Sequence, residues 1–220
     1  MSSLDYSVRE MLFEDFVQAF LPDLEILSRK ELTDLLKNSM RNRDVSSRIA
    51  LANLLIDSGA DAAVIGSEGE NVLHIFASRL RDPELEVPLL ERLLRSGADP
   101  NQQSPRYGMP LDEFMRNNRF TEDDLAPIYS VWFAHPDLDF FKEDRFGDSL
   151  WDRVCRGGSA ATHLVQRARA YIEAKTGAPA PAPRFRKQQP NGSWFHFTAD
   201  DRLTQDIDGK WRVEDDQSRA

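Results

Sequence analysis

Residues 49–61 read IALANLLIDSGAD and residues 87–99 read VPLLERLLRSGAD, so both stretches carry a Leu-Leu pair followed by Ser-Gly-Ala-Asp. The offset between them is 99 − 61 = 38 residues, and Asp137 lies a further 137 − 99 = 38 residues along the chain. Self-similarity at a period of roughly 20 to 50 residues is typical of proteins built from stacked repeats. The sequence therefore predicts a mainly α-helical stack.

Each repeat has the pattern of two helices and a turn. Gly59 and Gly97 directly follow a Leu-Leu helical pattern, where a glycine at positive φ can end a helix. A second series keeps the same period, because Leu111 follows Leu73 by 38 residues and Leu150 follows Leu111 by 39. Each of these leucines is expected to begin a further short helix. One helix pair cannot bury its apolar faces alone, so we expect neighbouring pairs to stack.

The repeats resemble the ankyrin repeat family over about residues 31–175. The resemblance rests on residues 54–61 (LLIDSGAD), residues 93–101 (LLRSGADPN) and the helix-opening segment at residues 69–74 (GENVLH). It implies an ankyrin-like helical solenoid of about four units, in which partners contact the loop tips between units and the exposed side of each first helix. It also implies that His74 bonds the backbone of the neighbouring turn.

The chain departs from the family at the Thr-Pro-Leu-His tetrapeptide, which survives only as NVLH at residues 71–74, MPLD at 109–112 and DSLW at 148–151. The period is also longer than the family's usual one. We therefore expect longer loops between paired helices, such as residues 79–86.

The repeats are flanked by other elements. Residues 1–176 are predicted to hold an N-terminal helical cap and the repeats, and the cap includes a capping box at Ser28 and Glu31. Residues 177–183 form an Ala-Pro linker. Residues 184–220 are predicted to form a small β-meander with a hairpin turn at Asp208 and Gly209. It is too small to be stable alone, so it should dock on the helices, through Trp194 or Trp211, or on a partner.

The charge and cysteine content bear on partners and location. The chain has 37 acidic and 28 basic residues and a formal net charge of −9. Such a surface repels phosphate backbones and anionic membranes, so we expect neither nucleic acid nor a membrane as partner. The single cysteine, Cys155, excludes an intramolecular disulfide, and no apolar segment of secretory or membrane-spanning type is seen. We expect a cytoplasmic protein.

No catalytic pattern is recognisable in the sequence. The histidines are far apart and show no zinc-site spacing, and Cys155 falls on an apolar helical face typical of a core residue. We therefore expect no enzyme activity, no metal and no cofactor. The alternative is an unrecognised enzyme with a site around His196 and Asp206.

The expected function is non-catalytic protein binding. The loop tips lie at residues 66–70, 103–107 and 142–146, and aromatic and arginine side chains make strong contact residues. The partner-binding candidates are Glu68, Arg106, Tyr107, Arg145, Phe146, Trp194 and Trp211. For Phe146 the alternative is packing beneath its own turn. One candidate partner is a basic toxin or effector neutralised by an immunity protein; the alternative is a general adaptor or a host-directed effector.

Overall fold

The computed structural model describes residues 3–117, 119–157 and 162–214. These residues form ten helices and four short strands, so the fold is mainly α. The chain divides into two compact units, Met1–Leu138 and Asp139–Ala220, here called the N-terminal unit and the C-terminal unit. Sequence analysis places a boundary at residues 177–183 instead, because the composition changes there. The sequence does not show that the strands after residue 183 contact the helix at Leu150–Arg156.

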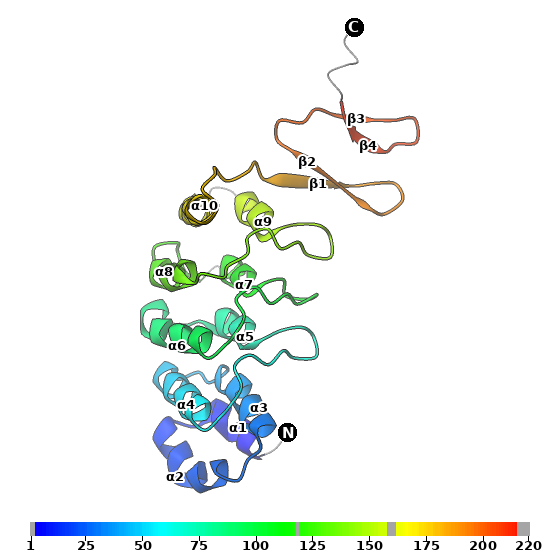
Figure 1. Cartoon of the computed structure of the whole chain (residues 1–220). Coiled ribbons are helices and arrows are strands. Elements are labelled where there is room, and N and C mark those ends of the chain that lie inside the picture. Colours follow the sequence, from blue (N-terminus) through cyan, green and yellow to red (C-terminus); the bar gives the residue numbers. More distant parts are fainter. Residues whose placement is uncertain (1–2, 118, 158–161, 215–220) are drawn as a thin grey trace. The chain divides into compact units, whose positions relative to one another are not determined.

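The N-terminal unit is built from helices at successive levels (Figure 1). The helices are α1 (Ser3–Glu10), α2 (Phe13–Leu24), α3 (Arg29–Ser39), α4 (Val45–Asp57), α5 (Val72–Arg79), α6 (Pro83–Arg95), α7 (Pro110–Arg116) and α8 (Ala126–Ala134). Helix α5 packs between α3 and α7, and α6 packs between α4 and α8. Three consecutive helix pairs, α3–α4, α5–α6 and α7–α8, therefore form two rows.

The local signals at the helix ends are confirmed. Ser28 Oγ accepts a hydrogen bond from the Glu31 amide at 3.3 Å, and the Glu31 carboxylate accepts one from the Ser28 amide at 2.9 Å. Gly59 and Gly97 have φ of 103° and 93°. The amides that follow them, of Ala60 and Ala98, donate to carbonyls five residues back at 2.9 and 3.1 Å, which is the Schellman arrangement.

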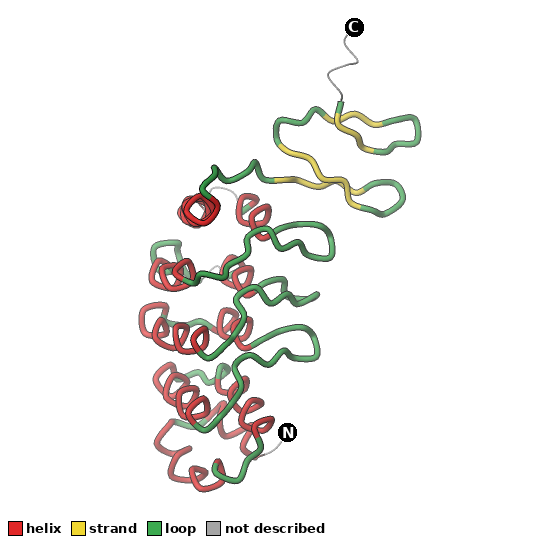
Figure 2. The backbone as a smooth tube through the Cα atoms, viewed as in Figure 1, coloured by secondary structure: helices red, strands yellow, loops and turns green. Residues whose placement is uncertain are grey.

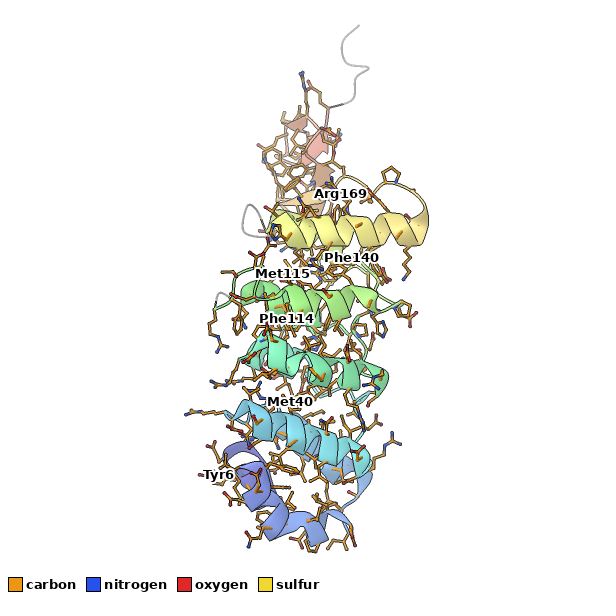
Figure 3. The ribbon with its side chains drawn as sticks, turned by 90° about the vertical axis from the view of Figure 1, so that its left-hand side faces the viewer. Tyr6, Met40, Phe114, Met115, Phe140 and Arg169 are labelled. Carbon is orange, nitrogen blue, oxygen red and sulfur yellow. The ribbon has the colours of Figure 1, made fainter. Side chains whose placement is uncertain are left out.

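Aromatic and sulfur-containing side chains fill the space between the levels. Met40 and Phe114 are buried there (Figure 3). The ring of Phe114 meets Phe76 edge-on at 6.2 Å between centroids and Trp132 edge-on at 5.4 Å. The helical periodicity of the sequence places these large apolar side chains on the buried faces. Their removal from water is the main stabilising contribution to this core.

One ion pair lies in this core, between Arg48 on α4 and Glu86 on α6, whose side chains are 1% and 0% exposed. Arg48 also donates to the carbonyls of Asn42, at 3.0 and 2.8 Å, and of Arg79, at 2.8 Å. Glu86 accepts from the amides of Arg81 and Asp82 at 2.8 and 3.0 Å. Each nitrogen of the Arg48 guanidinium and each oxygen of the Glu86 carboxylate therefore has a hydrogen-bond partner in the protein.

The expectation of a long loop over residues 79–86 is wrong. Helix α5 ends at Arg79 and α6 begins at Pro83, so only residues 80–82 connect them. Asp82 caps α6 by accepting from the Leu85 amide at 3.1 Å, and Pro83 fits the first turn because its nitrogen needs no acceptor. The length of the repeat lies instead in the segments between α4 and α5 and between α6 and α7.

The C-terminal unit contains two helices and four strands. They are α9 (Leu150–Arg156), α10 (Thr162–Thr176), β1 (Arg184–Gln188), β2 (Trp194–Thr198), β3 (Leu203–Gln205) and β4 (Trp211–Val213). The strands pair as two separate antiparallel hairpins, β1–β2 and β3–β4, rather than the single meander expected. Asp201 lies in the turn between the two hairpins, and its carboxylate accepts a hydrogen bond from the Thr198 amide at 2.6 Å.

The hairpin β1–β2 packs against α9 and the loop before it. The Arg184 amide donates to Asp152 at 2.6 Å and its guanidinium pairs with the same carboxylate at 2.9 Å, while Arg186 pairs with Asp148 at 2.8 Å. Trp194 meets Phe146 edge-on at 6.2 Å. Trp194 therefore contacts the loop before α9 within the same chain. Trp211 joins the two hairpins, since its amide and carbonyl bond the side chain of Gln189 at 2.7 and 3.0 Å.

Candidate binding groove

Two loop tips of the N-terminal unit are held side by side. Residues 66–70 precede α5 and residues 104–108 precede α7, and both segments project from the same side of the unit (Figure 2). Ser104 Oγ donates to the Glu68 carbonyl at 2.7 Å, and Gln102 Nε2 donates to the Gly69 carbonyl at 2.9 Å. Gly69 has φ of 77°, and a Cβ there would lie 3.1 Å from the Gln103 carbonyl. The tips are therefore fixed against each other.

A groove of about 620 Å³ runs beside the tips, the helices α5 and α7, and Arg41, which follows the end of α3. Pockets that bind small ligands or peptide side chains fall in the range of about 300–1,000 Å³. The lining that carries charge or aromatic surface comprises Arg41, Glu68, Glu70, Arg79, Arg106, Tyr107 and Glu113. The groove is therefore polar, with cationic and anionic groups facing the same space.

His74 forms the floor of the groove and is buried. Its Nδ1 accepts from the Asn71 amide at 3.1 Å, so Nε2 carries the proton and donates to the Gly108 carbonyl of the next tip at 3.0 Å. Burial lowers the pKa of His74, against a smaller opposite effect of the Gly108 carbonyl. The imidazole is thus a neutral structural link between α5 and the second tip, as its place in the sequence suggests.

Three of the residues expected to bind a partner meet at the groove. Arg106 pairs with Glu68 at 3.2 Å, and both side chains remain more than half exposed, at 67% and 52%. The Arg106 guanidinium also lies 5.2 Å from the ring centroid of Tyr107, which is half-buried. An exposed ion pair adds little stability, so its effect is to orient these side chains over the groove.

The other four expected contact residues belong to the C-terminal unit. Arg145 lies 4.6 Å from the ring of Phe146, and the guanidinium of Arg186 lies 4.9 Å from that ring and 4.3 Å from Trp194. Phe146 is half-buried by these contacts, so it packs within its own unit. Trp211 is covered by the Lys187 ammonium at 3.7 Å. The seven residues therefore form two groups, one in each unit.

Groups considered for catalysis are engaged separately. His196 Nε2 lies 3.5 Å from Asp148, whereas Asp206 accepts from the Lys210 amide at 2.9 Å and pairs with Arg212 at 2.7 Å. Burial raises the pKa of the Cys155 thiol to about 11. Within the described ranges, no group of three or more His, Cys, Asp or Glu side chains is placed to hold a metal ion. None of the described helices is long and apolar enough to span a bilayer.

Arg41 and Arg79 are groove residues that sequence analysis missed. Both are exposed and lie at the C-terminal ends of α3 and α5. The signal was present, because 79 − 41 = 38 is the repeat offset itself. It was missed because arginines near helix ends are common on any surface and complement the helix dipole there.

Comparison with known proteins gives a fold and no function. No protein-family model matches the chain, and no curated protein matches it. A solved structure from Leptotrichia buccalis C-1013-b, described as a functionally unknown protein, matches with a TM-score of 0.62 at 20% identity. The match covers 78% of this chain and 93% of that one. The arrangement of elements is therefore shared with a solved protein.

Proposed function

We propose that this protein is a non-catalytic protein-binding module on an ankyrin-like solenoid. The observation that carries the proposal is the pair of loop tips held side by side over a groove of about 620 Å³. Tips that are already ordered lose little conformational entropy when a partner binds. A rigid surface that presents Tyr107, Arg106 and Glu68 together is suited to recognition.

Support for the solenoid comes from agreement between sequence and geometry. The repeat offset of 38 residues relates Gly59 to Gly97, and both glycines end helices in the same Schellman arrangement. Helices in consecutive pairs contact their counterparts, α3 with α5, α5 with α7, α4 with α6 and α6 with α8. In repeat scaffolds of this kind the binding surface is formed by corresponding positions of successive units.

For the partner we propose a basic toxin or effector that the protein neutralises in the cytoplasm as an immunity protein. The net charge of −9 favours this choice, because a negative surface accelerates encounter with a basic protein.

The second candidate is a general adaptor or host-directed effector. The aromatic and cationic surface of Phe146, Trp194 and Arg186 would suit that role if it proves to be the docking element.

The test begins with affinity capture from the native host, followed by binding kinetics of the identified partner. We expect Arg106→Ala with Tyr107→Ala to speed dissociation by about tenfold or more, since a true hot-spot residue contributes on the order of 2 kcal/mol. The matched control is Tyr6→Ala with Arg95→Ala, which removes the same residue types from exposed positions outside the groove.

The association rate should fall as salt rises if the partner is basic. An association rate that does not change with salt would contradict a basic partner. Equal dissociation rates of both double variants would show that the interface lies outside the groove. Restored growth when the partner and this protein are co-expressed would separate an immunity protein from an adaptor.

A further inference from the structure

The carboxylates of the groove already have partners within the chain. Glu68 pairs with Arg106 at 3.2 Å and Glu113 pairs with Arg116 at 2.6 Å. The Glu70 carboxylate accepts from the Glu68 amide at 3.1 Å and so holds the first tip closed. Each of these three carboxylates therefore has a local contact within the chain.

Two arginines of the groove, Arg41 and Arg79, differ in this respect. Within the described part of the chain, neither Arg41 nor Arg79 forms an ion pair with a carboxylate. Arg41 donates to the side-chain carbonyl of Asn38 at 3.1 Å, and that oxygen also accepts from Arg9 at 3.1 Å. Partial burial lowers the pKa of Arg41 and the positive charges of Arg9 and Arg79 lower it further, against smaller opposite effects of Glu70 and Tyr107. Two guanidinium groups of like charge thus face the groove, and each has N–H donors that no carboxylate of the described residues occupies.

We propose that the groove binds an extended acidic segment of a protein partner, with carboxylates seated on Arg41 and Arg79 and the chain passing Tyr107. Guanidinium groups bind carboxylates through paired, charge-assisted hydrogen bonds, which are about twice as strong as neutral ones. This inference rests on the proposed function and deepens it: the partner is basic overall, which favours encounter with the acidic chain, and one local acidic segment of it enters the groove.

A peptide fits the groove better than a nucleic acid does. A nucleic acid carries a phosphate at every nucleotide and would meet Glu68, Glu70 and Glu113 as well as the arginines. A peptide can place carboxylates at the two arginines alone and present backbone amides, which are donors, to the glutamates. Successive side chains of an extended peptide point to opposite sides, so even an all-glutamate peptide presents only every second carboxylate to the groove.

The experiment is fluorescence polarisation with a fluorescein-labelled hexaglutamate peptide, compared with a hexaglutamine peptide and a ten-nucleotide oligothymidylate carrying the same label. The groove variant is Arg41→Gln with Arg79→Gln. The matched control is Lys30→Gln with Arg95→Gln, which changes the net charge equally at exposed positions outside the groove. Circular dichroism confirms that both variants fold.

We expect hexaglutamate to bind the full chain more tightly than hexaglutamine. The groove variant should lose about tenfold in affinity, as expected for one or two charge-assisted contacts, and the control less than about twofold. Equal loss in both variants, or equal binding of hexaglutamate and hexaglutamine, would overturn the proposal. Tighter binding of the oligothymidylate would overturn it in favour of a nucleic-acid ligand.

The outcome is separable from that of the proposed function. If hexaglutamate fails to bind while a captured partner still depends on Arg106 and Tyr107, the acidic segment is wrong and the binding role stands. If the captured partner is also indifferent to those residues, both proposals fall.

Discussion

At the scale of single residues, the positions with a local cause were the predictable ones. The capping box of Ser28 and Glu31 spans three residues, and the turns at Gly59 and Gly97 depend on glycine at positive φ. The sequence contains both partners of such interactions within one turn. Arg41 and Arg79 keep the repeat offset of 38 residues, but their importance depends on which carboxylates lie near them in space, and the offset does not show that.

His74 gives a pH prediction. Burial holds its pKa below the ordinary value of 6.5, which returns when the chain unfolds. Between those two values the unfolded state binds a proton that the folded state does not, so stability is complete above pH 6.5 and is lost as the pH falls through the lowered folded pKa. We expect a smaller free energy of unfolding at pH 5.5 than at pH 7.5.

Urea unfolding at both pH values measures this effect. The pH-dependent loss should shrink in His74→Gln and persist in His163→Gln, which changes an exposed histidine on α10. An unchanged loss in His74→Gln would show that other groups titrate in this range.

At the scale of elements, helices were predicted better than strands. Helical periodicity and caps indicate α3 to α7, whereas for β1 the sequence offers only its place within the β-meander predicted over residues 184–220. A strand in which charged residues occupy the packed face contradicts the usual alternation of apolar and polar positions. Its partners, Asp148 and Asp152, lie more than thirty residues away, so the sequence offered no local sign of the pairing.

The ion pair between α4 and α6 gives a stability prediction. Arg48→Met leaves the Glu86 carboxylate buried without its cation, and removing one partner of a buried pair costs about 3–5 kcal/mol. Combining Arg48→Met with Glu86→Gln should cost less than the sum of the single changes, because no charge is then left buried. Chemical unfolding of the three variants forms a double-mutant cycle. Strict additivity would contradict direct coupling.

At the scale of the whole molecule, the sequence predicted a helical stack followed by a β appendage that depends on the helices. It did not predict how that dependence is achieved. Asp148 and Asp152 are only 2% and 1% exposed. Burial raises the pKa of Asp152, but hydrogen bonds from Ser149 and Arg184 outweigh that effect and hold it below the usual range. The first hairpin is therefore bound by charge as well as by aromatic contact.

Removing that charge should loosen the C-terminal unit. Arg184→Gln with Arg186→Gln leaves the buried Asp152 carboxylate without its cation and leaves Asp148 paired with Arg156 alone, and we expect a loss of about 3 kcal/mol, since the arginines keep 35% and 26% of their side chains exposed. Hydrogen exchange of the α9 and β1 amides measures it locally. The exposed pair of Lys210→Gln and Arg212→Gln is the matched control. Equal protection in both variants would assign hairpin docking to Trp194 and Phe146 alone.

The ion pair of Arg48 and Glu86 has a consequence for the order of the levels. The two residues occupy the same place in consecutive repeats, because 86 − 48 = 38, yet they carry opposite charges. A tandem copy of the level that contains Arg48 would bring two guanidinium groups together in a water-free space, which is strongly unfavourable. The two helix pairs are therefore not interchangeable. The opposite charges of Arg48 and Glu86 fix which pair comes first in the stack and which comes second.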